Sequence, residues 1–257
     1  MLRVLVPFVI CGSLAAGQTA QEWIQQGIDA FRAAQYDEAI DNFKQAAAAD
    51  PKSLEAHLHL GEAYMATIVP GTTASEDKDK IRNAQQAFAR VLKLDPKNLA
   101  AMSSLASLSF AQTTADGSPE RYRLLDESRV WQTRLLELQP DNRDAHYALG
   151  VIAWSKFYPA WQASRSHAGL ALGDPGPFKD PKLRAAMRKE WGPVIEEGAA
   201  HLQRAIALDP AYDEAMSRLN LLIRERADFA DNQYAYLAEI AKADALVKRA
   251  IEIRKRR

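Results

Sequence analysis

The sequence predicts an all-α protein built as a solenoid of antiparallel helix pairs, and three observations support this. Helical patterns end four times at a short motif closed by Pro: Ala49-Asp50-Pro51, Leu94-Asp95-Pro96, Leu138-Gln139-Pro140 and Leu208-Asp209-Pro210. Pro cannot continue a helix and disfavours helical backbone in the residue before it, so each motif predicts a turn. Amphipathic stretches such as residues 87–94 precede these turns, and small residues recur at fixed places within the patterns.

Composition limits the classes of function. The 257 residues are 47% hydrophobic and 26% charged, which is enough apolar material for a sizeable core. Lys+Arg and Asp+Glu both number 33, so the chain has no net field to attract nucleic acid or an anionic membrane. We therefore expect no nucleic-acid partner.

The N-terminal residues are typical of an export signal. A positive start, Met1-Leu2-Arg3, precedes an apolar run over 4–10, and small residues follow over 13–17. These features predict a signal peptide over 1–17, a periplasmic or secreted protein, and no stable membrane span after cleavage. The alternative is a buried N-terminal strand or helix. The single cysteine, Cys11, lies in this segment, so the rest of the chain has neither a disulfide nor a cysteine metal site.

The first helix pair, residues 20–53, shows how two helices would pack. Gly27, Ala39 and Ala46 are small residues at expected helix crossings, where axes about 8–10 Å apart leave no room for larger side chains. Trp23 and Phe43 would fill the space beside them.

With Tyr36-Asp37-Glu38-Ala39 and Pro51, this pattern resembles the tetratricopeptide repeat, a unit of about 34 residues with two helices, A and B. The resemblance covers nearly all of the chain after residue 17. It implies a right-handed superhelical solenoid with repeats at about 20–53, 54–98, 99–142, 143–212 and 213–257. It also implies that the A helices line a concave face.

The second and third repeats are longer than the family unit. Pro51, Pro96 and Pro140 lie farther apart than a period of about 34 residues allows. In the third repeat, Ser118 followed by Pro119 is typical of an N-cap and a first helical turn, which predicts a B helix of about 20 residues ending near Leu138. We therefore expect B helices that are about two turns longer than the standard ones.

The fourth repeat contains a long insertion, residues 157–193, rich in Pro and aromatic residues. We expect it to interrupt the helices, with a short helix over 181–190. Its rings, Phe157, Tyr158, Trp161, Phe178 and Trp191, predict that it is ordered and folds back against the solenoid. Two outcomes remain open: the rings plug the groove, or they form one wall of a pocket.

No motif indicates catalysis, a cofactor or a metal. The histidines His57 and His59 point to different sides of a helix, and no His-Glu-x-x-His run or phosphate-binding Gly-rich loop occurs. Ser, His and Asp are present without a spacing that singles out a triad. We therefore predict a noncatalytic protein with no cofactor and no metal.

An aromatic and apolar stripe is expected along the concave face. One repeat position carries Phe31, Met65, Phe110 and Trp154, and Tyr147 and Trp161 lie nearby. These six residues are the candidate partner-binding site, although the same pattern is expected for an ordinary core. Family members that clamp a C-terminal carboxylate use Lys and Asn on their A helices. The matching positions here hold Ile24, Ile28, Leu58, Glu62, Ser103 and Ser107, so that activity is not implied.

The sequence therefore predicts a protein- or peptide-binding scaffold of the bacterial cell envelope. One alternative is a structural or assembly subunit of an envelope complex. The other is an enzyme with its site under the 157–193 insertion. The basic C-terminal stretch over 248–257 fits a polar cap on the end of a solenoid.

Overall fold

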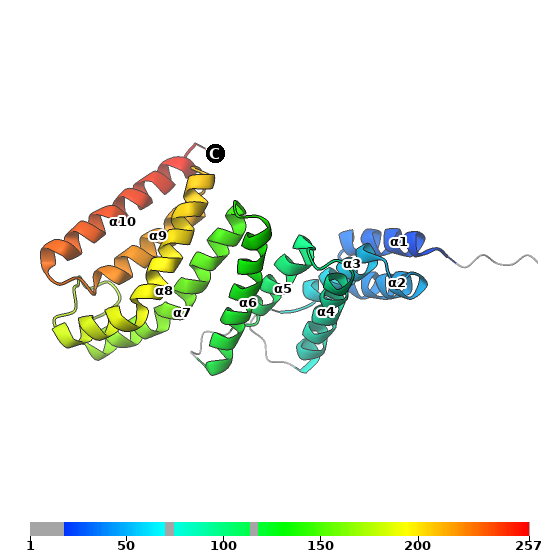
Figure 1. The fold of residues 1–257 in the computed structure, drawn as a ribbon, viewed down its shortest axis with the longest axis horizontal. Helices are drawn as coiled ribbons and strands as arrows, with labels where there is room; N and C mark the ends of the chain where they lie inside the picture. The colour runs from blue at the N-terminus through cyan, green and yellow to red at the C-terminus, as the bar shows by residue number, and fades with distance from the viewer. Residues whose placement is uncertain (1–17, 70–74, 114–117, 257) are drawn as a thin grey trace, which may run out of the picture.

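The structure, a computed structural model, describes residues 18–69, 75–113 and 118–256. These ranges contain ten α-helices and no strand, and Figure 1 shows them following one another along the long axis. The predicted all-α solenoid is confirmed. The helices are α1 (Ala20–Arg32), α2 (Tyr36–Ala49), α3 (Leu54–Ala66), α4 (Ser75–Leu94), α5 (Leu99–Ala111), α6 (Pro119–Leu138), α7 (Arg143–His167), α8 (Pro181–Leu208), α9 (Asp213–Ala227) and α10 (Gln233–Arg254).

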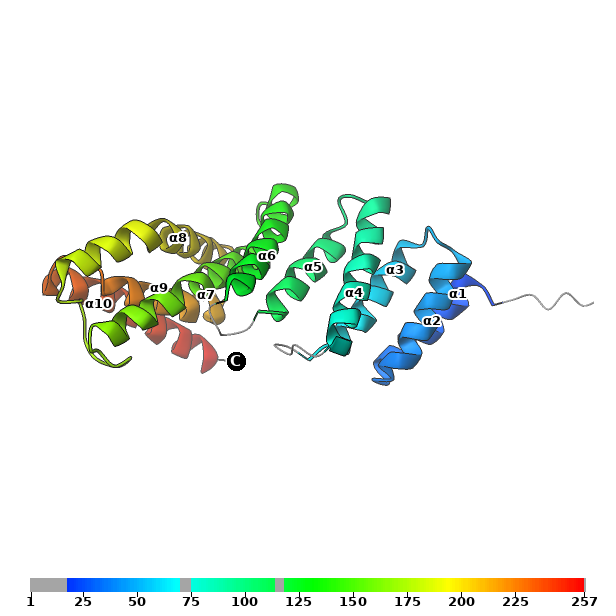
Figure 2. The ribbon, with the colours of Figure 1, turned by 90° about the horizontal axis from the view of Figure 1, so that it is seen from below.

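The helices form A–B pairs in chain order. The odd-numbered helices are the A helices, and each packs against the B helix that follows it. Each B helix also packs against the next A helix, so the pairs stack into one row. Figure 2 shows the first three pairs side by side, with the longer α7 and α8 beyond them.

The Asp of the turn motif has a direct structural role. The carboxylates of Asp50, Asp95 and Asp209 each accept a hydrogen bond from the backbone N–H two residues on, at 3.0, 3.1 and 2.9 Å. Because the intervening Pro has no N–H, this amide is the first one that the carboxylate can reach. The motif therefore ends a helix and fixes the turn after it.

Small residues allow the two helices of a pair to approach closely. A Cβ placed on Gly27 would lie 2.5 Å from the ring of Phe43, and one on Gly61 would lie 2.5 Å from the ring of Phe88. Both rings are fully buried. The predicted crossing at Gly27 is confirmed, and Gly61 forms the equivalent crossing in the second pair.

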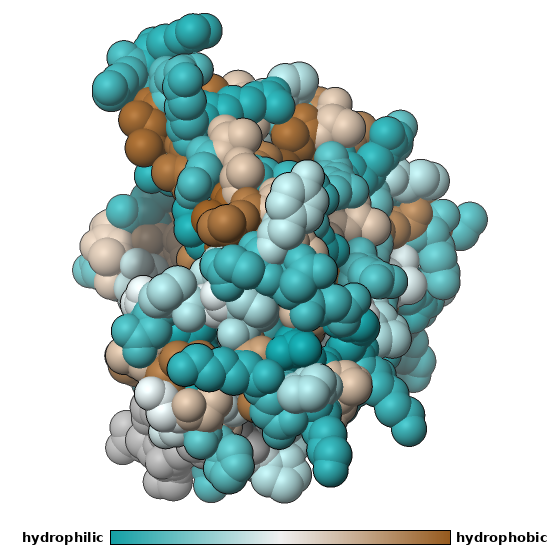
Figure 3. All heavy atoms as spheres, turned by 90° about the vertical axis from the view of Figure 1, so that its left-hand side faces the viewer, coloured by the Kyte–Doolittle hydropathy of each residue, from teal (hydrophilic) through white to brown (hydrophobic). Residues whose placement is uncertain are grey.

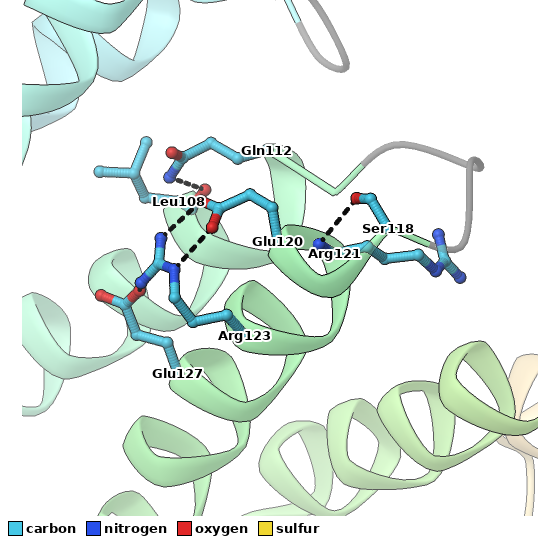
Figure 4. Close-up of polar contacts among 7 residues, drawn as sticks. All are labelled: Leu108, Gln112, Ser118, Glu120, Arg121, Arg123 and Glu127. Carbon is cyan, nitrogen blue, oxygen red and sulfur yellow. Dashed lines mark hydrogen bonds and ion pairs between the residues drawn. The ribbon is translucent and has the colours of Figure 1, made fainter.

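The B helices of the second and third repeats are elongated as predicted. Helices α4 and α6 each have 20 residues, against 14 in α2. Figure 4 shows the start of α6, where the Ser118 hydroxyl accepts a hydrogen bond from the Arg121 N–H at 3.2 Å. One turn later, Arg123 pairs with Glu120 at 2.8 Å and with Glu127 at 3.2 Å.

The predicted interruption of the helices by the insertion is wrong. Helix α7 runs through Pro159 and has 25 residues, and α8 runs through Pro193 and has 28. The helix over 181–190 is thus the first part of a long one. Pro159 cannot donate to the carbonyl of Ser155, but the Arg121 guanidinium donates to that oxygen at 2.7 Å instead. A replacement donor from α6 therefore lets α7 continue.

The insertion is ordered and packed on the solenoid, as predicted. Phe157 and Phe178 are fully buried, and their rings pack near Phe229, just after α9. The connection between α7 and α8 is held by Arg165, which donates to the carbonyl of Asp174 at 2.7 Å and to the carboxylate of Asp228 at 2.7 Å.

No helix in the described part of the chain is long and apolar enough to cross a membrane. The same residues contain no group of three or more His, Cys, Asp or Glu side chains arranged to hold a metal ion. The predicted signal peptide, residues 1–17, lies outside the described residues.

Candidate binding groove

The structure brings together three of the six predicted partner-binding residues. Phe110, Tyr147 and Trp154 line one groove. Phe31 packs instead on Tyr36, with ring centres 5.3 Å apart. Met65 packs on the apolar cluster around the buried ring of Phe88. The last residue, Trp161, lies in the core with 7% of its surface exposed.

The groove occupies a gap in the row of A helices. Helix α1 packs on α3, α3 on α5, and α7 on α9, but in the described residues α5 and α7 do not pack on each other. The elongated α6 lies between them, as Figure 1 shows. A groove of about 470 Å³, lined by residues of α5, α6, α7 and α9, lies at this gap.

The walls of the groove are apolar and aromatic, and its floor is polar. Helix α5 contributes Ser107 and Phe110, and α7 contributes Tyr147, Val151 and Trp154. The floor comes from α6: Gln132 is 8% exposed, and the buried Ser128 hydroxyl donates to the carbonyl of Ala106 at 2.9 Å. The half-exposed wall side chains are the parts available to another molecule.

Trp154 is held in one orientation by three neighbours. Its indole N–H donates to the Glu225 carboxyl at 3.1 Å, and its ring centre lies 4.7 Å from that of Tyr158. The guanidinium of Arg218, on α9, lies 4.2 Å from the ring centre. A preorganised aromatic side chain loses little conformational freedom when it binds a partner, so such residues suit an interface.

Burial is the main influence on the pKa values of two carboxyl groups near the groove, those of Glu225 and Asp228. Burial raises the pKa of Glu225 to about 8, against the opposing effects of the Trp154 hydrogen bond and the Arg218 charge. Burial also raises the pKa of Asp228, although Arg165 and Trp161 bind that carboxylate. The Trp161 indole N–H donates to Asp228 at 2.8 Å, so this tryptophan anchors the insertion rather than lining the groove.

Sequence reasoning missed Arg218 as a groove residue. It is one of 33 basic residues, and nothing in its neighbourhood along the chain distinguishes it. Its position over Trp154 depends on the packing of α9 against α7, which joins different repeats. The groove therefore offers aromatic contact area and one guanidinium, which is chemistry suited to noncovalent binding.

Comparison with known proteins agrees with this architecture. A family model described as "TPR repeat" matches residues 31–67, from the end of α1 to just after α3. The resemblance to the tetratricopeptide repeat is thus confirmed. No curated protein matches the chain in sequence.

Among solved structures, the crystal structure of MamA protein is similar with a TM-score of 0.56 and 17% identity, over 93% of this chain and 93% of that one. MamA (residues 41 to the end) from Desulfovibrio magneticus RS-1 has a TM-score of 0.56 and 15% identity, over 91% and 98%. The MamA RS-1 ArsTM double mutant has 0.58 and 14%, over 94% and 97%. At this identity the likeness concerns the fold.

Proposed function

We propose that this chain is a noncatalytic scaffold of the bacterial cell envelope, and that it binds a segment of a partner protein in the groove between α5 and α7. The observation that carries the proposal is the gap in the row of A helices. Half-exposed aromatic side chains line this gap, and polar side chains of α6 form its base. Grooves of this kind take an extended or helical segment through a few apolar anchors. The tetratricopeptide fold is consistent with this role.

The size and composition of the groove favour a protein segment. About 470 Å³ is room for a few side chains of a longer partner. The anchoring rings Phe110, Tyr147 and Trp154 come from two helices and span the opening. Aromatic residues of this kind are enriched at the energetic centres of protein interfaces.

The test is capture of partners from an envelope fraction with matched variants. Ser107→Trp fills the groove from an exposed position on α5, so it should lose the captured partner without a change in melting temperature. Ser103→Trp makes the same change one turn earlier, at an exposed position outside the groove lining, and should keep the partner. Equal capture by both variants would refute the groove as the site.

The envelope location is part of the same proposal. It is supported by the charged start, apolar run and small residues of the first 17 positions. N-terminal sequencing of the protein purified from its native host should give a start near Gln18. A mature protein that still begins at Met1 would contradict export by a cleaved signal.

A second candidate function is a subunit of a larger envelope assembly. It is favoured by apolar side chains exposed on α10, where Tyr234 is 86% and Leu237 is 54% exposed. Figure 3 shows this end of the molecule, where hydrophobic side chains emerge in small groups among hydrophilic ones. A stoichiometric complex that survives Ser107→Trp would favour this candidate over a groove-bound segment.

A further inference from the structure

Arg218 differs from the other arginines on its helix. On α9, Arg224 pairs with Asp244, and Arg226 pairs with Glu239. The half-buried Arg218 lines the groove, and its guanidinium carbon lies 4.2 Å from the ring centre of Trp154. The guanidinium thus faces the opening while stacked on an aromatic surface.

The carboxyl group that binds Trp154, that of Glu225, does not neutralise this arginine at neutral pH. Glu225 is 4% exposed, and one of its oxygens accepts the Trp154 indole N–H at 3.1 Å. Because burial raises the pKa of Glu225 to about 8, that group is mostly protonated near pH 7. The positive charge of Arg218 is therefore left for another anion.

We propose that the segment bound in the groove carries an Asp or Glu side chain next to a large apolar one, and that Arg218 receives the carboxylate. This inference rests on the proposed function and names the chemistry of its partner. A guanidinium can donate two parallel hydrogen bonds to a carboxylate, and such charge-assisted pairs are stronger when partly shielded from water. The apolar neighbour packs against Phe110 and Tyr147 on the groove walls.

An internal acidic side chain fits this site better than a chain terminus. The groove presents one guanidinium among apolar walls, with Ser107 and Val151 beside it. The Lys and Asn side chains that clamp a terminal carboxylate in related repeats are missing from the matching positions, such as Leu58 and Ser103.

A display library of random dodecapeptides, each fused to a coat protein at its C-terminus, tests the proposal on the full-length chain. Selection on the wild type should enrich Asp or Glu beside an aromatic or large aliphatic residue. The enriched peptide is then synthesised with an amidated C-terminus. Arg218→Gln should weaken its binding by about tenfold or more, equivalent to the loss of a partly buried charged pair. Arg224→Gln, the same charge change on the same helix, should leave binding within about twofold.

A change in the peptide tests the same contact without altering the protein. Replacing the peptide's Asp by Asn, or its Glu by Gln, should weaken binding to the wild-type protein about as much as Arg218→Gln does. The same peptide change should have little further effect on binding to the Arg218→Gln variant. This double-mutant cycle separates a direct pair from a change in folding.

The outcomes distinguish this inference from the proposed function. Peptides that lose binding on Ser107→Trp but show no acidic preference would overturn the inference and leave the groove as a binding site. If no selected peptide depends on Ser107, both proposals fail. Sedimentation should show that the full chain does not self-associate through the groove. Self-association that Ser107→Trp abolishes would mean that a second copy of the chain occupies the groove.

Discussion

At the scale of single residues, the helix crossings depend on the absence of a side chain. Gly61→Ala would place a Cβ 2.5 Å from the fully buried ring of Phe88, and overpacking of this kind costs about 1–3 kcal/mol. Gly192→Ala is the matched control, since its nearest neighbour, Arg188, would lie 3.9 Å away. The control should change stability by less than about 1 kcal/mol, because Ala favours helix over Gly but the following Pro193 disfavours helical backbone at a residue with a Cβ. Urea unfolding of both variants checks this; equal effects would show that Gly61 is not at a tight crossing.

Glu225 gives the molecule a defined pH dependence. Its pKa of about 8 in the folded protein lies above the ordinary value of 4.5, so the folded state holds the proton more tightly than the unfolded state does. The stability from this group is complete below pH 4.5 and is lost as the pH rises through 8. Glu225→Gln keeps an oxygen for the Trp154 N–H and removes the titration.

The variant should therefore gain stability relative to the wild type between pH 5 and pH 8, by on the order of 2–4 kcal/mol. Denaturant unfolding at the two pH values measures the gain. The same difference between variant and wild type at both values would show that Glu225 does not titrate in this range.

At the scale of elements, α7 passes a proline because another helix supplies the missing donor. Arg121 donates to the carbonyl of Ser155 at 2.7 Å, the oxygen that Pro159 leaves without its helical partner. Pro159→Ala would restore the N–H, so Arg121→Met should be less damaging in that background. We expect a coupling of about 1 kcal/mol in a double-mutant cycle measured by urea unfolding. Strictly additive effects would contradict this account of Pro159.

The connection between α7 and α8 depends on the buried pair of Arg165 and Asp228, which are 3% and 2% exposed. The wild type should resist trypsin at Lys179 and Lys182. Asp228→Ala leaves a buried guanidinium without its carboxylate, at a cost of about 3–5 kcal/mol. It should be cut at these lysines much faster. Asp231→Ala, which removes an exposed partner of Arg188, is the control and should stay resistant. Rapid cutting of the wild type would show that the insertion is not docked.

The repeated elements could be predicted from sequence because their causes are local. The Asp50 and Asp95 turns, the glycines of α1 and α3 and the Ser118 cap each act over a few residues or within one helix pair. The insertion could not be predicted in the same way. Pro159 predicts a break by itself, and the donor that prevents it is Arg121, 34 residues before the Ser155 carbonyl that it binds.

The candidate site was predicted in part for the same reason. Repeat positions selected Phe110 and Trp154, and both residues line one groove in the structure. They also selected Trp161, which a hydrogen bond to Asp228, 67 residues later, holds in the core. Arg218 was missed because its role comes from a contact between different repeats.

At the scale of the whole molecule, the row of A helices has a break, and the groove lies at that break. The A helices pack in sequence from α1 to α5 and again from α7 to α9, with the break at the elongated α6. The aromatic stripe is consequently divided. Phe31 and Met65 lie in well-packed repeats, whereas Phe110 and Trp154 line the opening.

The most direct test of the binding groove is photo-crosslinking in the native host with benzoylphenylalanine at two equivalent phenylalanines. Phe110 lines the groove, and Phe31 occupies the same repeat position, is also half-exposed, and packs on Tyr36 away from the groove. The account predicts a covalent adduct with a partner protein from position 110 and none above background from position 31. Adducts from position 31 with none from position 110 would contradict it, as would their absence from both.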